Sequence, residues 1–211
     1  MNTNPFFDPE PKKKPNLFIA LLQGLVVLTA IVIVLYLFVI TPSQVDGPSM
    51  QPNFYTGELL LTNRLVQWLG ATEVGKSIGV DYQRGDVVTF QKPGYREFVK
   101  RILALPGDKI AVRDGHIYIN NQRLEEDYLP PALYTNGGDF IVEGGESIEV
   151  PPGYYICIGD NRPASNDSRY AAIGLIDRDW IKGRVILRFY PFEKFSIIPT
   201  GKYELVLEDN V

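Results

Sequence analysis

The sequence is poor in cysteine and in histidine, and both shortages narrow the chemistry that the chain can support. Cys157 is the only cysteine among 211 residues, so an internal disulfide and a metal site built on several cysteines are both excluded. Within the run YYICI it is expected to be a small core residue. His116 is the only histidine and directly follows a turn-forming Asp-Gly pair. A histidine in that place is usually solvated, which argues against a Ser-His-Asp triad.

An excess of positive charge is also missing. The chain has 21 lysines and arginines against 25 aspartates and glutamates, a formal net charge of −4. This balance argues against a protein that binds nucleic acid through the phosphate backbone. We therefore expect no nucleic-acid partner.

Residues 70–77, GATEVGKS, match the letters of the phosphate-binding P-loop. A phosphate cradle needs a buried strand before it and a helix after it, and the flanking sequence indicates neither. We read the segment as a solvated loop between β segments, and expect no nucleotide partner, no cofactor and no metal.

Charge is absent altogether from residues 17–40, LFIALLQGLVVLTAIVIVLYLFVI. As a helix this run would be about 36 Å long, which exceeds the hydrocarbon core of a bilayer at about 30 Å. A cleavable signal peptide would have a shorter apolar core and a small-x-small cleavage site, and Thr41 and Pro42 follow here instead. The run predicts a single transmembrane helix.

Basic residues lie close to this span on its N-terminal side only. Lys12, Lys13 and Lys14 precede it, and the next basic residue is Arg64. The positive-inside rule then predicts a single-pass cell-membrane protein with a cytoplasmic N-terminus. Its parts would be a cytoplasmic tail (1–16), a transmembrane helix (17–40) and an extracytoplasmic domain (41–211).

The domain after residue 41 has the pattern of a β protein. Short runs of branched and aromatic residues alternate with clusters of Gly, Pro, Asn and Asp, as is typical of strands. Asp114-Gly115 predicts a tight hairpin, and residues 109–152 are a candidate subdomain of hairpins. Helical turns are expected only at 63–69 and 177–181. The predicted strands are 58–63, 86–91, 96–105, 109–113, 116–119, 154–158 and 184–190.

Ser49 lies in the irregular segment VDGPSMQPNF, residues 45–54. Pro48 has no N–H and drives Gly47 towards extended geometry, and Pro52 disfavours helix at the residue before it. Such a stiff backbone suits either a structural turn or a hydroxyl that is held in one place. A serine hydroxyl becomes a good nucleophile only when a base removes its proton.

A lysine can be that base if burial lowers its pKa. In REFVKRILALPGD, residues 96–108, Lys100 shares one strand face with Phe98 and Ile102, while Arg101 points to the other face. The same pattern fits an edge-strand lysine whose amine reaches water. Periodicity leaves both interpretations open.

A dense polar loop, GDNRPASNDSR, follows the predicted strand 154–158 and occupies residues 159–169. It has the composition of a solvated turn. A loop that leaves a buried strand is also a common place for catalytic side chains.

Together these segments resemble the boxes of the bacterial type I signal peptidases. GPSMQP matches the serine box, RGDVVTF (84–90) the next box, FVKRILALPGD (98–108) the lysine box and GDNRPASNDSR the last. They follow a membrane anchor in the family's order and with compatible spacing. The resemblance therefore covers the whole architecture of the chain.

The resemblance implies a membrane-bound serine endopeptidase that cuts signal peptides from exported preproteins, with small side chains favoured one and three residues before the cleaved bond. Ser49 would be the nucleophile and neutral Lys100 the general base. Ser165 would hydrogen-bond the Lys100 amine. The polar loop would be held by further support residues, namely Asp160, Arg162, Asp167 and Arg169. The implied fold is a twisted, largely antiparallel β domain with a small β insertion.

Two departures from the family pattern stand out. Some members place a serine hydroxyl of the oxyanion hole two residues before the nucleophile, where this chain has Gly47. The second oxyanion donor is therefore unassigned. The family usually has Pro-Thr and an aliphatic residue after the serine-methionine pair, where this chain has PNF (52–54). We expect this change to alter packing and not chemistry.

The expected partners are signal peptides of secreted preproteins, the lipid bilayer and an export translocon. The nine residues from Ile40 to Ser49 can reach about 30 Å at most, which keeps the serine near the bilayer. Phe54, Tyr55 and residues 188–199 would either form an apolar rim that touches lipid or fill the core.

Other functions remain open from the sequence. A membrane-tethered β domain could bind an export partner without catalysis, and a maturation peptidase could serve one or a few substrates. Self-cleaving repressors use the same dyad but are soluble and carry a DNA-binding segment.

Overall fold

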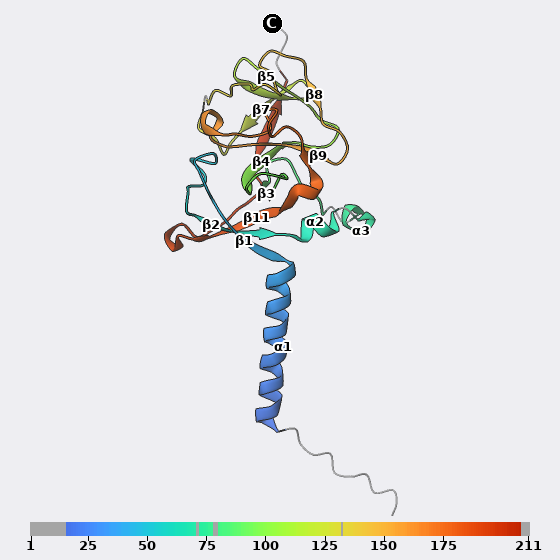
Figure 1. Ribbon diagram of the computed structural model, residues 1–211, viewed down its shortest axis with the longest axis vertical. Coiled ribbons are helices and arrows are strands. Elements are labelled where there is room, and N and C mark those ends of the chain that lie inside the picture. The colour runs from blue at the N-terminus through green and yellow to red at the C-terminus, as the bar shows by residue number, and fades with distance from the viewer. Residues whose placement is uncertain (1–15, 71, 78–79, 132, 208–211) are drawn as a thin grey trace, which may run out of the picture. The chain divides into compact units, whose positions relative to one another are not determined.

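The chain is described here from a computed structural model, which covers residues 16–70, 72–77, 80–131 and 133–207 (Figure 1). The Lys12–Lys14 cluster and nearly all of the expected cytoplasmic tail (1–16) lie outside these residues. The chain divides into two compact units, residues 1–37 and 38–211, and each is described by itself.

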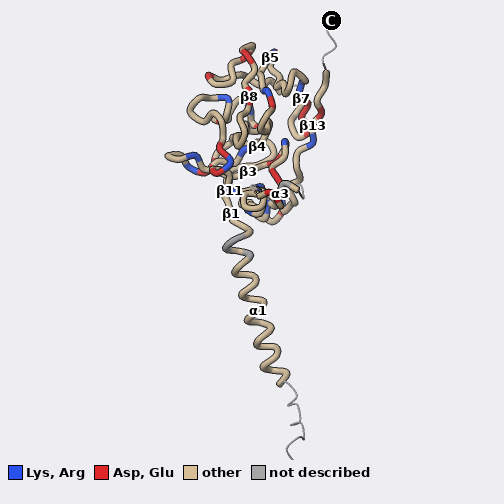
Figure 2. Tube along the Cα trace, turned by 90° about the vertical axis from the view of Figure 1, so that its right-hand side faces the viewer, with Lys and Arg blue, Asp and Glu red and all other residues tan. Residues whose placement is uncertain are grey.

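The first unit contains one long helix, α1 (Leu17–Phe38). Figure 2 shows that no Lys, Arg, Asp or Glu lies along it. The Thr29 hydroxyl donates a hydrogen bond of 2.8 Å to the Leu25 carbonyl, so this polar group is satisfied within the helix. Residues Leu17–Val34 have a mean hydropathy of 2.8, and by length and composition the helix can cross a membrane.

The second unit is built on antiparallel β sheets, which confirms the predicted fold class. In the described residues the larger sheet has the order β1-β2-β11-β3-β4-β9-β10, and β12 pairs with β11. Register shifts within β11 and β4 curl this sheet. Its strands are β1 (Ile40–Gln44), β2 (Leu59–Asn63), β3 (Val87–Phe90), β4 (Phe98–Ala104), β9 (Tyr154–Ile158), β10 (Ile176–Asp177), β11 (Ile181–Tyr190) and β12 (Ser196–Ile197).

A second, five-stranded sheet has the order β13-β7-β6-β5-β8 within the described residues. The predicted hairpin is present, with Asp114 and Gly115 both at positive φ in its turn. The C-terminal strand completes this sheet by pairing with β7, a contact that the sequence did not indicate. The strands are β5 (Lys109–Arg113), β6 (His116–Ile119), β7 (Gln122–Glu126), β8 (Ile148–Glu149) and β13 (Tyr203–Val206).

Short helices lie in the connections between strands. The helical turns expected at 63–69 and 177–181 correspond to α2 and η2. The segment with the P-loop letters follows a helix instead of a strand and itself contains α3, so the solvated loop expected there is partly helical. The short helices are α2 (Leu65–Leu69), α3 (Glu73–Ser77), η1 (Arg162–Ala164), η2 (Arg178–Trp180) and η3 (Phe192–Lys194).

The apolar core of the second unit fixes the segment around Ser49. Met50 is fully buried and Phe54 is 3% exposed, and both pack in one cluster with Leu60 and Val99. Burial of these side chains holds the turn against the curled sheet. Cys157, on β9, is also fully buried, as expected for a small core residue.

Candidate active site

Ser49 lies in a tight turn after Gly47, whose φ of +93° belongs to the region that favours glycine. The Gln51 N–H closes the turn with a hydrogen bond of 3.0 Å to the Pro48 carbonyl. Asn161 holds the same turn from the polar loop, because its backbone N–H donates to the Ser49 carbonyl at 3.0 Å. Buried Met50 on one side and Asn161 on the other therefore fix the position of the half-buried Ser49 hydroxyl.

Lys100 lies in the middle of β4, between β3 and β9, and is only 2% exposed. Because β4 is an interior strand, the interpretation of Lys100 as an edge-strand lysine that reaches water does not hold. The Lys100 Nζ is 2.5 Å from the Ser49 Oγ, a hydrogen bond between residues 51 positions apart. It also lies 5.6 Å from the centre of the Phe98 ring, its expected neighbour on the same strand face.

Burial lowers the pKa of the Lys100 amine from 10.5 to about 8, and the carboxylates of Asp167 and Asp160 oppose this shift. Removal of water disfavours the ammonium form more than the two carboxylates favour it. Above pH 8 the amine is mostly neutral. A neutral amine within hydrogen-bond reach of a hydroxyl can accept its proton.

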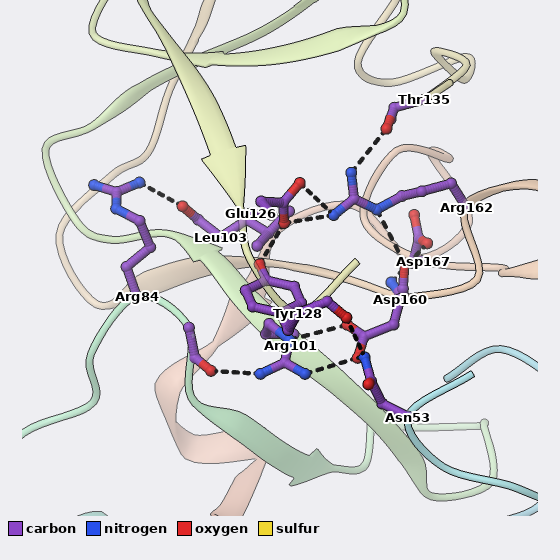
Figure 3. Close-up of polar contacts among 12 residues, drawn as sticks. Asn53, Arg84, Arg101, Leu103, Glu126, Tyr128, Thr135, Asp160, Arg162 and Asp167 are labelled. Atoms are coloured by element: carbon purple, nitrogen blue, oxygen red, sulfur yellow. Dashed lines mark hydrogen bonds and ion pairs between the residues drawn. The ribbon is translucent and has the colours of Figure 1, made fainter. Parts of the chain in front are cut away.

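Two buried ion pairs hold the polar loop, and Figure 3 draws the first of them, between Asp160 and Arg101. Asp160 accepts two hydrogen bonds from the Arg101 guanidinium, at 2.9 and 2.7 Å, so Arg101 points away from Lys100 as the strand alternation predicts. Asp167 and Arg169 are both fully buried and pair with each other at 2.9 Å. Charges that are buried in this way need such partners.

Arg162 and Ser165 have surroundings that the sequence did not indicate. The Arg162 guanidinium pairs with Glu126 and donates to the Thr135 hydroxyl, while the Arg162 backbone N–H donates to the Asp160 carbonyl at 3.1 Å. The expected hydrogen bond from Ser165 to the Lys100 amine is not formed. The Ser165 Oγ is buried without a hydrogen-bond partner among the described residues.

Ser49 and Lys100 share a cavity of about 170 Å³. Its walls come from the segment before Ser49, from the start of β4 and from the polar loop. His116 lines a different cavity, next to β7 and β13. The residues that line the cavity shared by Ser49 and Lys100 are Gln44, Val45, Asp46, Gly47, Pro48, Ser49, Met50, Arg96, Glu97, Phe98, Val99, Lys100, Ala164 and Asn166.

Asn53 takes part in this network, although no role was predicted for it from the sequence. Its side-chain amide donates to the Asp160 carboxylate at 2.8 Å and to the Tyr128 carbonyl at 2.9 Å. Asn53 is the residue at which the chain departs from the family's Pro-Thr pattern. The departure could have been read as a signal, because an amide can bridge two acceptors where a threonine hydroxyl donates once.

Comparison with known proteins identifies the family of the chain. The sequence profile of the family described as "Signal peptidase, peptidase S26" matches residues 18–190. Signal peptidase IB of Staphylococcus aureus is 32% identical over 189 residues, which cover 83% of this chain and 93% of that protein. Signal peptidase I U of Bacillus subtilis (strain 168) is 32% identical over 183 residues, covering 86% and 92%.

Among solved structures, the crystal structure of a signal peptidase I from Enterococcus faecalis V583 aligns with a TM-score of 0.41 at 30% sequence identity, covering 49% of this chain and 96% of that one. The family profile covers most of the chain, and both sequence relatives are more than 30% identical to it. The chain therefore belongs to the signal peptidase family S26 and is a serine-type peptidase.

Proposed function

We propose that this chain is a membrane-anchored signal peptidase that removes signal peptides from exported preproteins, with Ser49 as nucleophile and neutral Lys100 as general base. The observation that carries the proposal is the 2.5 Å contact between the Ser49 hydroxyl and a buried amine. Neither group alone would suffice, because the hydroxyl needs a base and the amine needs burial to lose its proton.

The reaction follows from this contact. Ser49 Oγ attacks the scissile carbonyl while its proton passes to Lys100 Nζ. The ammonium then gives that proton to the leaving amine, and the peptide bond breaks to leave an acyl-enzyme. Neutral Lys100 next takes a proton from water, the hydroxide attacks the ester, and Ser49 regains its proton as the signal peptide leaves.

One donor for the developing oxyanion is the backbone N–H of Ser49. Pro48 has no N–H, and Gly47 has no side chain to replace a serine hydroxyl. Loss of one such donor costs about 10²–10³ in rate elsewhere, so we expect a second donor within the cleft.

The polar loop supports the dyad in this proposal. The Arg101–Asp160 pair fixes the loop against β4, which carries Lys100, and the Asp167–Arg169 pair stabilises the loop itself. The unpaired Ser165 hydroxyl is available to orient the amine when Lys100 turns from Ser49 towards the leaving group.

The membrane arrangement is also part of the proposal. A cytoplasmic tail (1–16), a transmembrane helix (17–40) and an extracytoplasmic domain (41–211) with a β insertion (109–152) would hold the serine near the exported substrate and its translocon. Exposed apolar side chains of the second unit favour contact with lipid; they are Tyr55, Tyr190, Phe192, Phe195 and Ile197. Phe54 does not contribute to this surface, because it is 3% exposed and lies in the core.

The test is incubation of the detergent-solubilised full chain with a preprotein, with the cut site read by mass spectrometry. The wild type should release the signal peptide at one site after a small residue. Ser49→Ala and Lys100→Met should release none. Ser147→Ala, which changes an exposed serine outside the cleft, should cut normally.

A non-catalytic binding domain predicts a different result. It would show no cleavage by the wild type, or equal cleavage by Ser49→Ala from a contaminating protease. Either outcome would contradict the assignment of Ser49 as the nucleophile.

A further inference from the structure

The buried carboxylate of Glu126, at the end of β7, links the second sheet to the polar loop (Figure 3). Glu126 accepts hydrogen bonds from Arg162 Nη2 at 2.5 Å and 2.6 Å, one to each carboxylate oxygen. The side chains are 7% and 3% exposed. Both bonds come from the same guanidinium nitrogen, and each is a charge-assisted hydrogen bond that holds Arg162 against Glu126.

Arg162 passes this constraint to the backbone next to Ser49. Its Nε donates to the Gly159 carbonyl at 3.2 Å, and its Nη1 donates to Thr135 Oγ1 at 2.7 Å. The segment between Gly159 and Arg162 includes Asn161, whose N–H donates to the Ser49 carbonyl at 3.0 Å. A shift of the Arg162 side chain therefore moves the backbone that holds the nucleophile.

Glu126 also acts on the strand of the general base. The Tyr128 hydroxyl donates a hydrogen bond to Glu126, and the centre of the Tyr128 ring lies 3.8 Å from the Arg101 guanidinium carbon. Burial raises the pKa of Tyr128 well above its usual value, so this hydroxyl keeps its proton. Arg101 adjoins Lys100 on β4, and its contact with Asp160 closes the network.

We propose that Glu126 is a positioning residue for the Ser49–Lys100 reaction, acting through Arg162 on the nucleophile and through Tyr128 and Arg101 on the base. This inference rests on the proposed function. It assigns the second sheet a part in catalysis, because Glu126 would hold both the segment next to Ser49 and the strand β4 that carries Lys100.

The arrangement points to a geometric effect and not to tuning of the amine. Glu126 does not line the cavity that contains Ser49 and Lys100. The charged groups with the largest effect on the pKa of the Lys100 amine are those of Asp167, Asp160 and Arg169. Loss of the Glu126 charge should therefore misplace the reacting atoms without changing the proton affinity of the base.

The test compares Glu126→Gln with Glu125→Gln in the full chain. Glu125 is the neighbouring carboxylate of β7, its side chain is 46% exposed, and it pairs with Arg123 on the same strand. The quantities to measure are kcat, KM and the pH profile for cleavage of a preprotein. Circular dichroism gives the folded fraction of each variant, to which kcat is normalised. Glu126→Gln should lose about 10²-fold in kcat, the size expected of a small misplacement. KM and the midpoint of the pH profile should not change, and Glu125→Gln should match the wild type.

Wild-type kcat in folded Glu126→Gln would overturn the inference, because a purely structural residue changes stability and leaves turnover intact. A shifted pH midpoint would also overturn it, since Glu126 would then act on the charge of Lys100. If Glu126→Gln does not fold, Glu126→Asp decides. Its carboxylate is one methylene shorter and cannot hold both contacts to Arg162, so a reduced kcat supports the inference and a wild-type kcat refutes it.

Ser49→Ala is included in the same experiment. Turnover by this variant would refute the proposed function. An inactive Ser49→Ala beside a fully active Glu126→Gln would refute the role of Glu126 alone.

Discussion

Lys100 is a buried amine whose pKa lies about 2.5 units below its usual value, equivalent to roughly 3 kcal/mol against the ammonium form. The wild type should therefore gain activity as the pH rises through about 8, because only the neutral amine accepts the Ser49 proton. Lys100→Arg should be inactive across this range, since a guanidinium stays protonated. Initial rates from pH 6 to 10 test this. A flat profile, or turnover by Lys100→Arg, would contradict the role of Lys100 as base.

The same burial makes Lys100 costly for stability. Below pH 8 the folded state carries the full cost of a desolvated amine, and the cost disappears as the pH rises from 8 towards 10.5, because there the unfolded state binds more protons. Lys100→Met should therefore raise the free energy of unfolding at pH 7 by about 1–2 kcal/mol, after the lost hydrogen bond to Ser49 is subtracted. The melting temperature should rise accordingly.

Thermal unfolding in detergent at pH 7 and pH 10 measures this effect. The advantage of Lys100→Met should shrink at the higher pH. Lys109→Met, at a lysine that is 59% exposed, serves as the control and should gain nothing. An unchanged or lower melting temperature for Lys100→Met at pH 7 would count against the buried ammonium.

At the residue scale, the sequence predicted which way the side chains of a strand point but not whether they are buried. Strand alternation correctly placed Arg101 opposite Lys100. It could not choose between a buried and a solvated amine, because that depends on which strands pair with β4. Glu126 and Tyr128 carried no local signal either, since their partners Arg162 and Arg101 lie 36 and 27 positions away.

At the scale of the element, the C-terminal end of β9 has no room for a side chain. A Cβ on Gly159 would lie 2.2 Å from Ser165 Oγ and 2.4 Å from the Ser49 carbonyl oxygen. Gly159→Ala must therefore push the polar loop away from the nucleophile. We expect a loss of about 10²-fold in kcat, measured on preprotein cleavage.

Gly24→Ala is the matched control, because a Cβ there meets nothing within 4 Å and the residue lies in a helix. It should cleave normally. A fully active Gly159→Ala would mean that the loop can move without loss of the dyad.

Strands with a clear pattern could be predicted, and strands without one could not. The runs at 109–113 and 116–119 match β5 and β6, since branched residues flank a turn that requires positive φ. β8, β10 and β12 have two residues each, too few to show a period. β1 has the sequence ITPSQ, in which a proline and polar residues hide the strand, and its pairing with β2 stabilises it.

At the scale of the whole molecule, the second unit carries an apolar surface of its own. Phe192 and Ile197 are 76% and 77% exposed, and Phe195 is 61% exposed. A chain that begins at residue 38 should therefore bind lipid vesicles even without α1. Serine at all three positions should weaken this binding clearly, because burial of each apolar side chain contributes about 1.5–3 kcal/mol.

Flotation with vesicles of neutral lipid measures this binding. Val142→Ser, at an apolar residue that is 53% exposed and lies outside the surface, is the control and should bind as before. Equal binding by the triple variant would show that these side chains do not enter the lipid.

The class of fold and the family could be predicted at this scale because both depend on features spread along the chain: one uncharged run of 24 residues, a β pattern and four boxes in order. The two-sheet arrangement could not be predicted. The second sheet takes its last strand from residues 203–206, and such a contact between distant segments leaves no local pattern.

The burial of Cys157 has a practical consequence. Its thiol is fully buried, and burial raises its pKa, which disfavours the thiolate that alkylating reagents need. The natural chain should therefore not react with maleimide while it is folded. A cysteine introduced at the exposed Asn121 would be its sole reactive thiol, and an impermeant maleimide applied to intact cells would then report on which side of the bilayer the hydrolase faces.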